Sequence, residues 1–434
     1  MIKHLNITSC PCGRRVVVLS YGMGVDSTAI LLRWLIDAAS RVVEGEAFDL
    51  CDLIVLTAQT GDEFLSTGSL VDAHILPRLA AAGVRFVEVS RAWEPGQIVV
   101  LQDTRNPTGL HVRPTLDHNY FRLSDELMRA GTIPTSGGVH MCSIHSKAEP
   151  LDKWINANVG SHAHAMGFNA DETGRASRDT AARGPSIAFG YNADEGKRAV
   201  NATAYRDSTK QEVGAFYPLI EWGWDYQDCI DYIATHTGVA RWPKSACGYC
   251  PFSGGRKLVM DRYRAEPDSA AFALVLETMA LAINPRMKLF VTKTLRSLLL
   301  DDGNTEALKL ADAMLDRAEW AVYDVRRIFS GPGKAQRDIR IVKRGTRSEI
   351  ESEMITVIEK NNSVDVIEEP KVDRNGSPLI NPKTGKQKIS KRYAYPVIEQ
   401  LLCTGPSFAV DKGPKNFDDR WVEEEATYHL VHNL

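Results

Sequence analysis

Residues 15–36 read RVVVLSYGMGVDSTAILLRWLI, and this stretch decides the fold. Residues 16–19 are apolar and rich in valine, which is typical of a strand buried in a parallel sheet. A glycine-containing turn follows, and residues 29–36 are apolar enough to form a buried helix. A strand, a glycine turn and a helix in this order form a phosphate-binding arrangement.

The turn contains the groups that bind phosphate. Its glycines let the backbone turn tightly and approach an oxyanion, and the first helical turn supplies unpaired N–H groups. The hydroxyls add donors, and Asp26 can cap the helix or help to hold a metal-bound nucleotide. The alternative is that Asp26 and Ser27 only cap the helix. The candidate nucleotide-binding residues are Ser20, Gly22, Gly24, Val25, Asp26, Ser27 and Thr28.

The turn differs from two common nucleotide motifs. No Gly-Lys-Ser/Thr follows, as in a Walker loop, and the third glycine of the Rossmann fingerprint is missing. Residues 22–27 resemble the PP-loop of ATP pyrophosphatases and of sulfonucleotide reductases, usually Ser-Gly-Gly-x-Asp-Ser, with Gly22 in place of serine. The resemblance implies an α/β fold of the adenine nucleotide α-hydrolase (HUP) type. That fold has an open, twisted parallel sheet with helices on both faces, and here it would bind ATP with Mg²⁺.

A second segment agrees with the resemblance. The predicted strand 53–58 leads into Gln59-Thr60-Gly61-Asp62-Glu63, which is similar to the family's Asp-Thr-Gly-x-Glu segment with Gln59 in place of aspartate. Polar groups after a buried parallel strand lie at the edge where open α/β sheets bind ligands. Gly61 and Glu63 are therefore expected at the nucleotide site.

A third segment covers residues 163–175 and is similar to the family's Gly-x-x-x-x-Glu-x-x-Arg. The resemblance places Glu172 and Arg175 in the nucleotide site, since a guanidinium pairs well with phosphate or sulfate oxygens. A surface salt bridge between them is the alternative. Residues 217–222 also resemble the family's Tyr-Pro-Leu-x-x-Trp, so the matches run in family order from about residue 15 to 252.

Three cysteines form a candidate metal centre. Cys247 and Cys250 make a CxxC that is stiffened by the following proline. Residues 142–151 are similar to the reductase pattern Cys-x-x-x-x-Lys-x-x-Pro-Leu, which pairs with a distant CxxC to hold a [4Fe-4S] cluster. The reductases have a second cysteine where this chain has Met141, so Cys142 contributes one thiolate.

Three interpretations of this centre remain open. Three cysteines would hold a [4Fe-4S] cluster with one open iron, as in several tRNA-thiolating PP-loop enzymes. Alternatively, His145 completes a tetrahedral Zn²⁺ site with the three cysteines, or the cysteines bind no metal. Lys147 either steadies phosphate charge near the centre or is a solvated helix residue, and the resemblance favours the first role.

Composition limits the class of protein. The chain has 434 residues, 44% hydrophobic and 25% charged, which is ordinary for a globular protein with about two domains. The N-terminus has no apolar core of signal-peptide length, and no segment approaches the length needed to span a bilayer. Eight cysteines are too few for a secreted disulfide scaffold of this length. We therefore expect a cytoplasmic protein without membrane contact.

The C-terminal third differs from the rest. Residues 1–255 are the predicted nucleotide-binding domain, 256–330 have a helical pattern, and a glycine-proline turn at 330–333 separates a small basic α+β region, 331–434. Residues 334–347 hold six Lys/Arg against one acidic residue, and residues 371–392 hold seven against one. Because the formal net charge is only −3, a nucleic-acid surface would have to be local to these stretches. The alternative is that both stretches are ordinary solvated surface.

Three functions compete. The first is an ATP pyrophosphatase that adenylates its substrate, with Asp26, Ser27, Lys147, Glu172 and Arg175 in the chemistry. Coupled sulfur transfer onto a nucleic acid, as in DNA phosphorothioation or tRNA thiolation, would need a sulfur donor such as a cysteine desulfurase. The second is sulfonucleotide reduction, although Cys403 does not fit the reductases' catalytic Glu-Cys-Gly-x-His segment. The third is a nucleotide- or nucleic-acid-binding module without catalysis.

Overall fold

The computed structural model describes residues 16–43, 45–134, 141–159, 162–165, 213–290, 292–331, 334–354, 366–370, 373, 377–380, 387, 389–393 and 397–432. Two compact units are formed, one within residues 1–126 and 134–272 and the other within 127–133 and 273–434. The boundary at 272/273 differs from the three regions expected from composition. Each unit is described by itself.

The first unit contains a sheet whose strands occur in the order β6-β5-β4-β1-β7-β8. Its central strand β1 has β4 and β7 as parallel neighbours. The chain fills one side of β1 first and then the other, so the direction of winding reverses between β1 and β7. The strands are β1 (Val16–Ser20), β4 (Leu53–Gln59), β5 (Arg85–Arg91), β6 (Ile98–Thr104), β7 (His162–Ala165) and β8 (Val213–Phe216).

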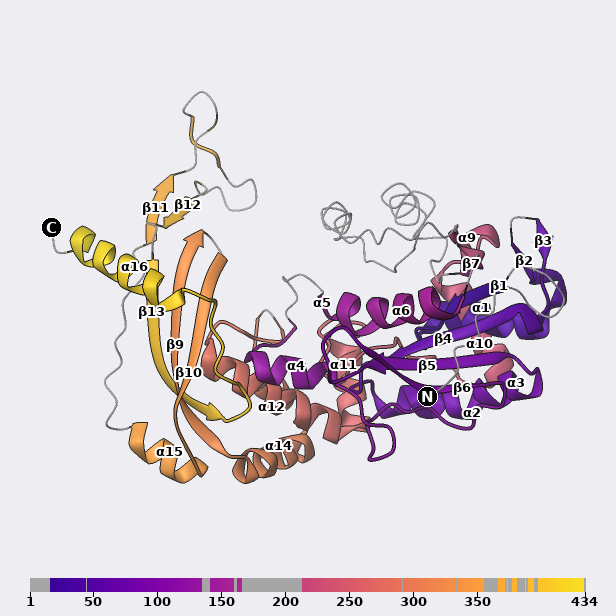
Figure 1. Ribbon diagram of the computed structural model, residues 1–434, viewed down its shortest axis with the longest axis horizontal. Coiled ribbons are helices and arrows are strands. Elements are labelled where there is room, and N and C mark those ends of the chain that lie inside the picture. The colour runs from indigo at the N-terminus through magenta and orange to yellow at the C-terminus, as the bar shows by residue number, and fades with distance from the viewer. Residues whose placement is uncertain are drawn as a thin grey trace. The chain divides into compact units, whose positions relative to one another are not determined.

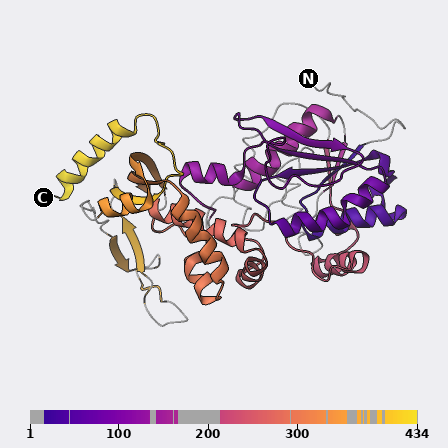
Figure 2. The ribbon, with the colours of Figure 1, turned by 90° about the horizontal axis from the view of Figure 1, so that it is seen from below.

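Helices cover both faces of this sheet (Figures 1 and 2). Val16 and Val18 point to one face and pack in a cluster with Trp154 of α6. Val17 and Leu19 point to the other face and pack with residues of α1, α2, α3 and α10. The helices of this unit are α1 (Val25–Ile36), α2 (Leu65–His74), α3 (Leu76–Ala81), α5 (Met141–Ser143), α6 (Glu149–Asn158), α9 (Pro218–Glu221), α10 (Tyr226–Thr237) and α11 (Arg256–Ala265).

The α/β architecture is as expected, but the sheet is mixed rather than wholly parallel. β6 pairs antiparallel with β5, whereas the other neighbours are parallel. Only residues 92–97 connect these two strands. A connection this short can form a hairpin but cannot carry the chain back for a parallel crossover. A small ribbon of β2 (Val42–Val43) and β3 (Glu46–Ala47) lies outside this sheet.

The second unit has its own three-stranded antiparallel sheet in the order β10-β9-β13. A separate two-stranded ribbon pairs β11 with β12. The strands are β9 (Trp320–Gly331), β10 (Lys334–Gly345), β11 (Val366–Pro370), β12 (Ile389–Tyr393) and β13 (Val397–Pro406). The helices are α13 (Leu295–Asp301), α14 (Thr305–Arg317), α15 (Arg347–Met354) and α16 (Phe417–His432), while α4 (Leu123–Ala130) and α12 (Pro267–Ile283) each cross a boundary between the units.

The helical pattern expected to reach about residue 328 ends earlier. α14 stops at Arg317, and residues 320–331 form the central strand of the second sheet. This segment is rich in aromatic and β-branched residues, and two partner strands satisfy its backbone, so pairing overrides the helical pattern. Gly331 pairs with Lys334, so the described residues on either side of 332–333 belong to one antiparallel pair of strands.

Candidate functional site

The predicted phosphate-binding turn lies between the central strand β1 and helix α1. Gly24 is the N-cap residue of α1, and its backbone is extended. Because Gly24 has no side chain, the N-cap residue itself cannot cap this helix. Gly22 is exposed, with nothing within 4 Å of the position that a Cβ would take. Both features are compatible with an anion-binding helix N-terminus.

The predicted hydroxyl groups of the turn have different surroundings. The Thr28 hydroxyl is buried and lies 3.3 Å from the Tyr21 hydroxyl. The Ser20 hydroxyl lies 2.6 Å from His164 Nε2 on β7, across the point where the winding of the sheet reverses. Ser27 is buried in the first turn of α1, and Asp26 beside it is half-buried. The Ser20 and Thr28 hydroxyls thus have protein partners.

Two residues outside the motif, Trp242 and Gln59, contact the turn through Met23. Met23 is buried and has a left-handed backbone, with φ 62°, which is uncommon for a residue other than glycine. Its carbonyl oxygen accepts a hydrogen bond of 3.0 Å from the indole N–H of Trp242. Its sulfur lies 3.9 Å from Gln59 Nε2, at the end of β4.

The segment after β4 packs tightly and is mostly buried. Gly61 has φ 78°, and a Cβ there would lie 2.5 Å from a side-chain carbon of Arg122, so the position requires glycine. Asp62 accepts hydrogen bonds from Tyr249 and from the amide and hydroxyl of Ser124. Burial raises the pKa of Asp62, although these hydrogen bonds oppose the rise. Asp62 organises the site and was not singled out from the sequence.

Glu63 and Lys147 form an ion pair beside this segment. Glu63 is fully buried, and Lys147, a third exposed, donates to its Oε1 over 2.8 Å. The Glu63 Oε2 atom has no hydrogen-bond partner within the described chain. Burial disfavours the Lys147 ammonium, but Glu63 and the Cys247 and Cys250 thiols outweigh burial and raise its pKa. Lys147 is therefore a fixed cation at neutral pH.

The three candidate metal-binding cysteines lie in buried or half-buried positions around this ion pair. Cys142 is in α5, just before a π-helical turn, and the Cys247 sulfur lies 3.2 Å from the Thr60 hydroxyl. Burial raises the pKa of all three thiols, that of Cys250 to about 11, while Lys147 lowers it. Their thiol chemistry suits a soft metal. As placed, however, the described residues include no group of three His, Cys, Asp or Glu able to hold a metal ion.

Three predicted site residues remain: His145, Glu172 and Arg175. His145 lies between two carboxylates, 3.8 Å from Glu126 and 3.9 Å from Glu149. This placement gives it acidic partners in addition to any role as a fourth zinc ligand. Glu172 and Arg175 lie outside the described residues.

The N-terminus of α2, at the same sheet edge, has a carboxylate from a distant part of the chain. Its N-cap residue Phe64 cannot cap the helix. Instead, Glu266 accepts from the amides of Leu65 and Ser66 over 2.9 and 3.0 Å. The positive end of this helix is thus neutralised internally.

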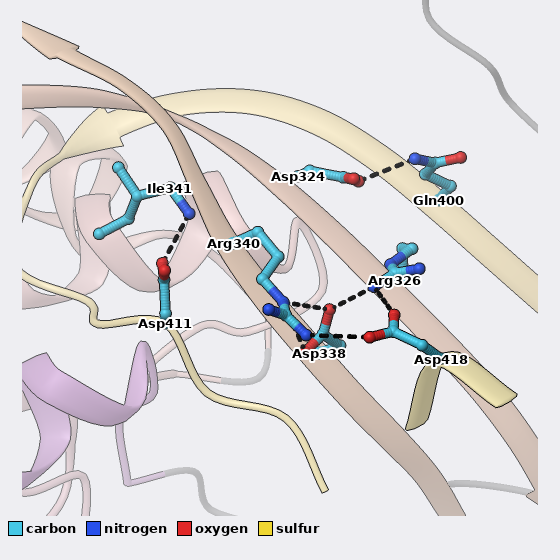
Figure 3. A network of polar contacts seen from close by, with 8 residues as sticks. All are labelled: Asp324, Arg326, Asp338, Arg340, Ile341, Gln400, Asp411 and Asp418. Atoms are coloured by element: carbon cyan, nitrogen blue, oxygen red, sulfur yellow. Dashed lines mark hydrogen bonds and ion pairs between the residues drawn. The ribbon is translucent and has the colours of Figure 1, made fainter. Parts of the chain in front are cut away.

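The basic stretch 334–347 is largely compensated by acidic groups. Asp338 is fully buried and accepts from Arg326 and Arg340, and Asp418 of α16 also contacts both arginines (Figure 3). Arg337 is half-buried and donates to the carbonyls of residues 130 and 131. Arg344 and Arg347 pair with acidic residues as well. Residues 371–392 lie mostly outside the described part of the chain.

No family model, curated protein or solved structure matches the chain. In the part of the chain that the structure describes, no helix combines the length and apolar character needed to cross a bilayer.

Proposed function

We propose that this chain is a PP-loop enzyme that binds ATP at residues 22–28 and uses it to adenylate a substrate. The observation that carries the proposal is the position of the α1 N-terminus. Its N-cap residue Gly24 has no side chain to cap the helix, and this N-terminus follows the central strand directly, where the winding of the sheet reverses. Open α/β sheets bind ligands outside the carboxyl ends of their strands at this position.

The strand order supports the HUP-type fold. Counted along the chain without the antiparallel edge strand β6, the order β5-β4-β1-β7-β8 is 3-2-1-4-5, with all neighbours parallel. This is the doubly wound arrangement used by nucleotide-binding domains. The order was not specified by the sequence motifs and is therefore independent of the resemblance in the turn.

The proposed reaction is transfer of an adenylyl group. An oxygen of the acceptor attacks the α-phosphorus, the bond from that phosphorus to the bridging oxygen breaks, and pyrophosphate leaves. The amides of α1 would stabilise charge on the phosphates, and Asp26 would help to hold Mg²⁺, which neutralises the departing pyrophosphate. The protein mainly positions the reactants and supplies a preorganised electrostatic environment. Lys147 is a nearby fixed cation for the acceptor side.

Sulfur transfer to a nucleic acid is the finer part of the proposal. If a cluster binds Cys142, Cys247 and Cys250, it would supply a sulfur that displaces AMP from the adenylated acceptor. Three thiols suit such a group chemically, but as placed they do not form a ligand set for one ion, so no step above depends on it. The stretches 334–347 and 371–392 are the proposed nucleic-acid contacts. In the first, bound acidic side chains reduce the positive charge that a phosphate backbone would meet.

Sulfonucleotide reduction is the alternative reaction. It requires an accessible late cysteine, and Cys403 is buried in β13. Burial also raises the pKa of its thiol to about 12, so the nucleophilic thiolate is scarce at neutral pH. These observations favour adenylation over reduction.

The test is incubation of the full chain with ATP and Mg²⁺, with and without tRNA or DNA. We expect one pyrophosphate for each adenylyl group, counted as acceptor-bound AMP plus the free AMP released by hydrolysis, with an acceptor raising the rate. Nucleotide binding by calorimetry without turnover would indicate the non-catalytic module, and thioredoxin-dependent release of sulfite would indicate the reductase. Failure to bind any adenine nucleotide would refute the proposal.

Metal and sulfide analysis tests whether the three cysteines bind a cluster. We expect iron near four atoms per chain and matching sulfide after anaerobic purification, and loss of both in Cys250→Ser. Cys51→Ser is the matched control, because Cys51 is an exposed thiol outside the site. Zinc without iron would replace the cluster with a structural metal and remove the sulfur-carrier role.

A further inference from the structure

We infer that residues 242–250, the connecting segment, make nucleotide binding at the turn and the conformation of Cys247 and Cys250 depend on each other. This inference concerns regulation of the proposed site, and it rests on the proposed function. The segment contacts the phosphate-binding turn near its beginning and contains the two cysteines near its end. It is a continuous physical link between the two parts of the site.

At its beginning the segment holds the turn directly. The buried Trp242 indole donates to the Met23 carbonyl over 3.0 Å. Three residues later, Ser245 packs against Gly24, where a Cβ would lie 3.6 Å from the Ser245 nitrogen. Ser245 and Trp242 therefore contact the two residues that immediately precede α1. A phosphate that draws the turn toward the helix amides has to move or tighten these contacts.

The rest of the segment is fixed to the strand end after β4. Residues 63 and 247 form an antiparallel bridge, and the Gly248 amide donates to the Asp62 carbonyl over 2.8 Å. The Tyr249 hydroxyl donates to the Asp62 carboxylate over 2.8 Å. The Cys250 amide closes the CxxC turn on the Cys247 carbonyl over 2.9 Å. Every second or third residue is thus bonded.

Lys147 adds a second contact in the middle of the link. Its ammonium lies 3.5 Å from the Ser245 hydroxyl and pairs with the buried Glu63, which bridges to residue 247. Because the segment is short and bonded along its length, a shift at Trp242 cannot be absorbed by free backbone. Coupling between two sites is reciprocal, so a ligand or modification at the cysteines should alter nucleotide affinity by the same factor.

Amide hydrogen exchange of the full chain, measured by mass spectrometry with and without Mg²⁺-ATP, tests the inference. We expect nucleotide to slow exchange in peptides covering 246–250 by about fivefold or more, at the lower end of typical coupling. In Trp242→Phe, which keeps the ring but loses the N–H donor, the nucleotide effect on 246–250 should fall below about twofold. The matched control is Trp222→Phe, at a half-buried tryptophan on the same unit whose ring contacts Arg33 and Trp34 of α1 rather than the turn.

The outcomes separate the two proposals. If calorimetry shows that ATP binds but exchange at 246–250 is unchanged in the natural chain, the coupling is refuted while the nucleotide site stands. If ATP does not bind, the proposed function fails and takes the coupling with it. The comparison in the natural chain decides the first point even if Trp242→Phe folds poorly.

Discussion

Two helices begin at the same edge of the first sheet, but the groups at their N-termini differ. α1 follows β1 and starts at Gly24 without a side-chain cap. α2 follows β4, and Glu266, about 200 residues later in the chain, accepts from its first two amides. Both positions have the positive end of a helix dipole. Glu266 neutralises that of α2, whereas the N-cap residue of α1 is a glycine and is the proposed ligand site.

The difference shows where stability and function are separated in this unit. A carboxylate on a helix N-terminus stabilises the fold by satisfying amides and the dipole. Gly24 at the N-cap of α1 supplies no such carboxylate, and the turn that precedes the helix also contains Met23 in a left-handed conformation. Both features suit a site that binds an anion in the functional state. A carboxylate added at the N-terminus of α1 should therefore stabilise the fold, whereas loss of the Glu266 carboxylate at α2 should destabilise it.

The largest expected effect comes from closing the α1 site. In Gly24→Asp, the new carboxylate should cap α1 and compete with phosphate, so ATP affinity should fall about a hundredfold, equivalent to about 2.7 kcal/mol. The same change should raise the free energy of unfolding by about 0.5 kcal/mol, since the N-cap backbone already suits aspartate. Calorimetry and urea unfolding measure the two effects.

Gly24→Ala is the matched control for this prediction. A Cβ at this position would make only ordinary contacts, the nearest at 3.6 Å from the Ser245 nitrogen. Alanine should therefore weaken ATP binding much less than aspartate. An equal loss of ATP affinity in both variants would mean that steric bulk and not the carboxylate weakens binding. This result would contradict the proposed difference between the two helix N-termini.

A smaller effect should follow from opening the α2 site. Glu266→Gln removes a charged acceptor from two amides, and we expect the free energy of unfolding to fall by about 2 kcal/mol. In this variant, stability should also rise with added sulfate, because the α2 amides become available to an external anion. Glu94→Gln, at an exposed loop position, should change neither property. An unchanged unfolding midpoint in Glu266→Gln would show that the cap contributes little.

The smallest expected effect concerns the hydrogen bonds around Gln59, which contacts the turn before α1. Gln59, which contacts Met23, donates to the fully buried Glu88 over 2.7 Å, and His111 Nδ1 lies 2.7 Å from the same carboxylate. The hydrogen bond with Glu88 raises the pKa of His111 despite partial burial, with further help from Asp72. No equivalent histidine contacts the Glu266 cap among the described residues.

Because the His111 pKa is raised on folding, its stabilising contribution is complete below its unfolded pKa of about 6.5 and is lost as pH rises through the folded value. We expect His111→Gln to lower the free energy of unfolding by about 1 kcal/mol at pH 6 and by less at pH 9. Denaturant unfolding across this pH range measures the difference. A loss that grows with pH would contradict the protonated pairing with Glu88.

The sequence predicted the elements near the turn well and the later ones less well. The strand, turn and helix of residues 16–36 form as expected, because apolar runs of this kind are stable only when buried. The antiparallel direction of β6 was missed, since strand periodicity contains no information on direction. The sequence pattern predicts helix as far as about residue 328, because apolar residues in a mixed pattern fit a helix until partner strands are known.

The sequence predicted only part of the candidate site, because it does not show which distant residues are in contact. Lys147 and Glu63 were named from the family resemblance and the CxxC from its spacing, and the structure places Lys147 against Glu63. Trp242 was missed because a lone tryptophan has no spacing signal, although it lies five residues before Cys247. Glu266 could not be found, since a charged residue in a helical stretch resembles any solvated one until its tertiary partner is known.

By itself the sequence determined the strand, the glycine turn and the helix of residues 16–36, because local burial and backbone freedom are encoded in neighbouring residues. It also determined which side chains have the chemistry to bind phosphate or metal. Only the tertiary structure decided that Glu266 caps α2 and that Trp242 holds Met23. Those features depend on contacts between residues about 200 apart in the chain, whose proximity is set by the packing of the whole unit.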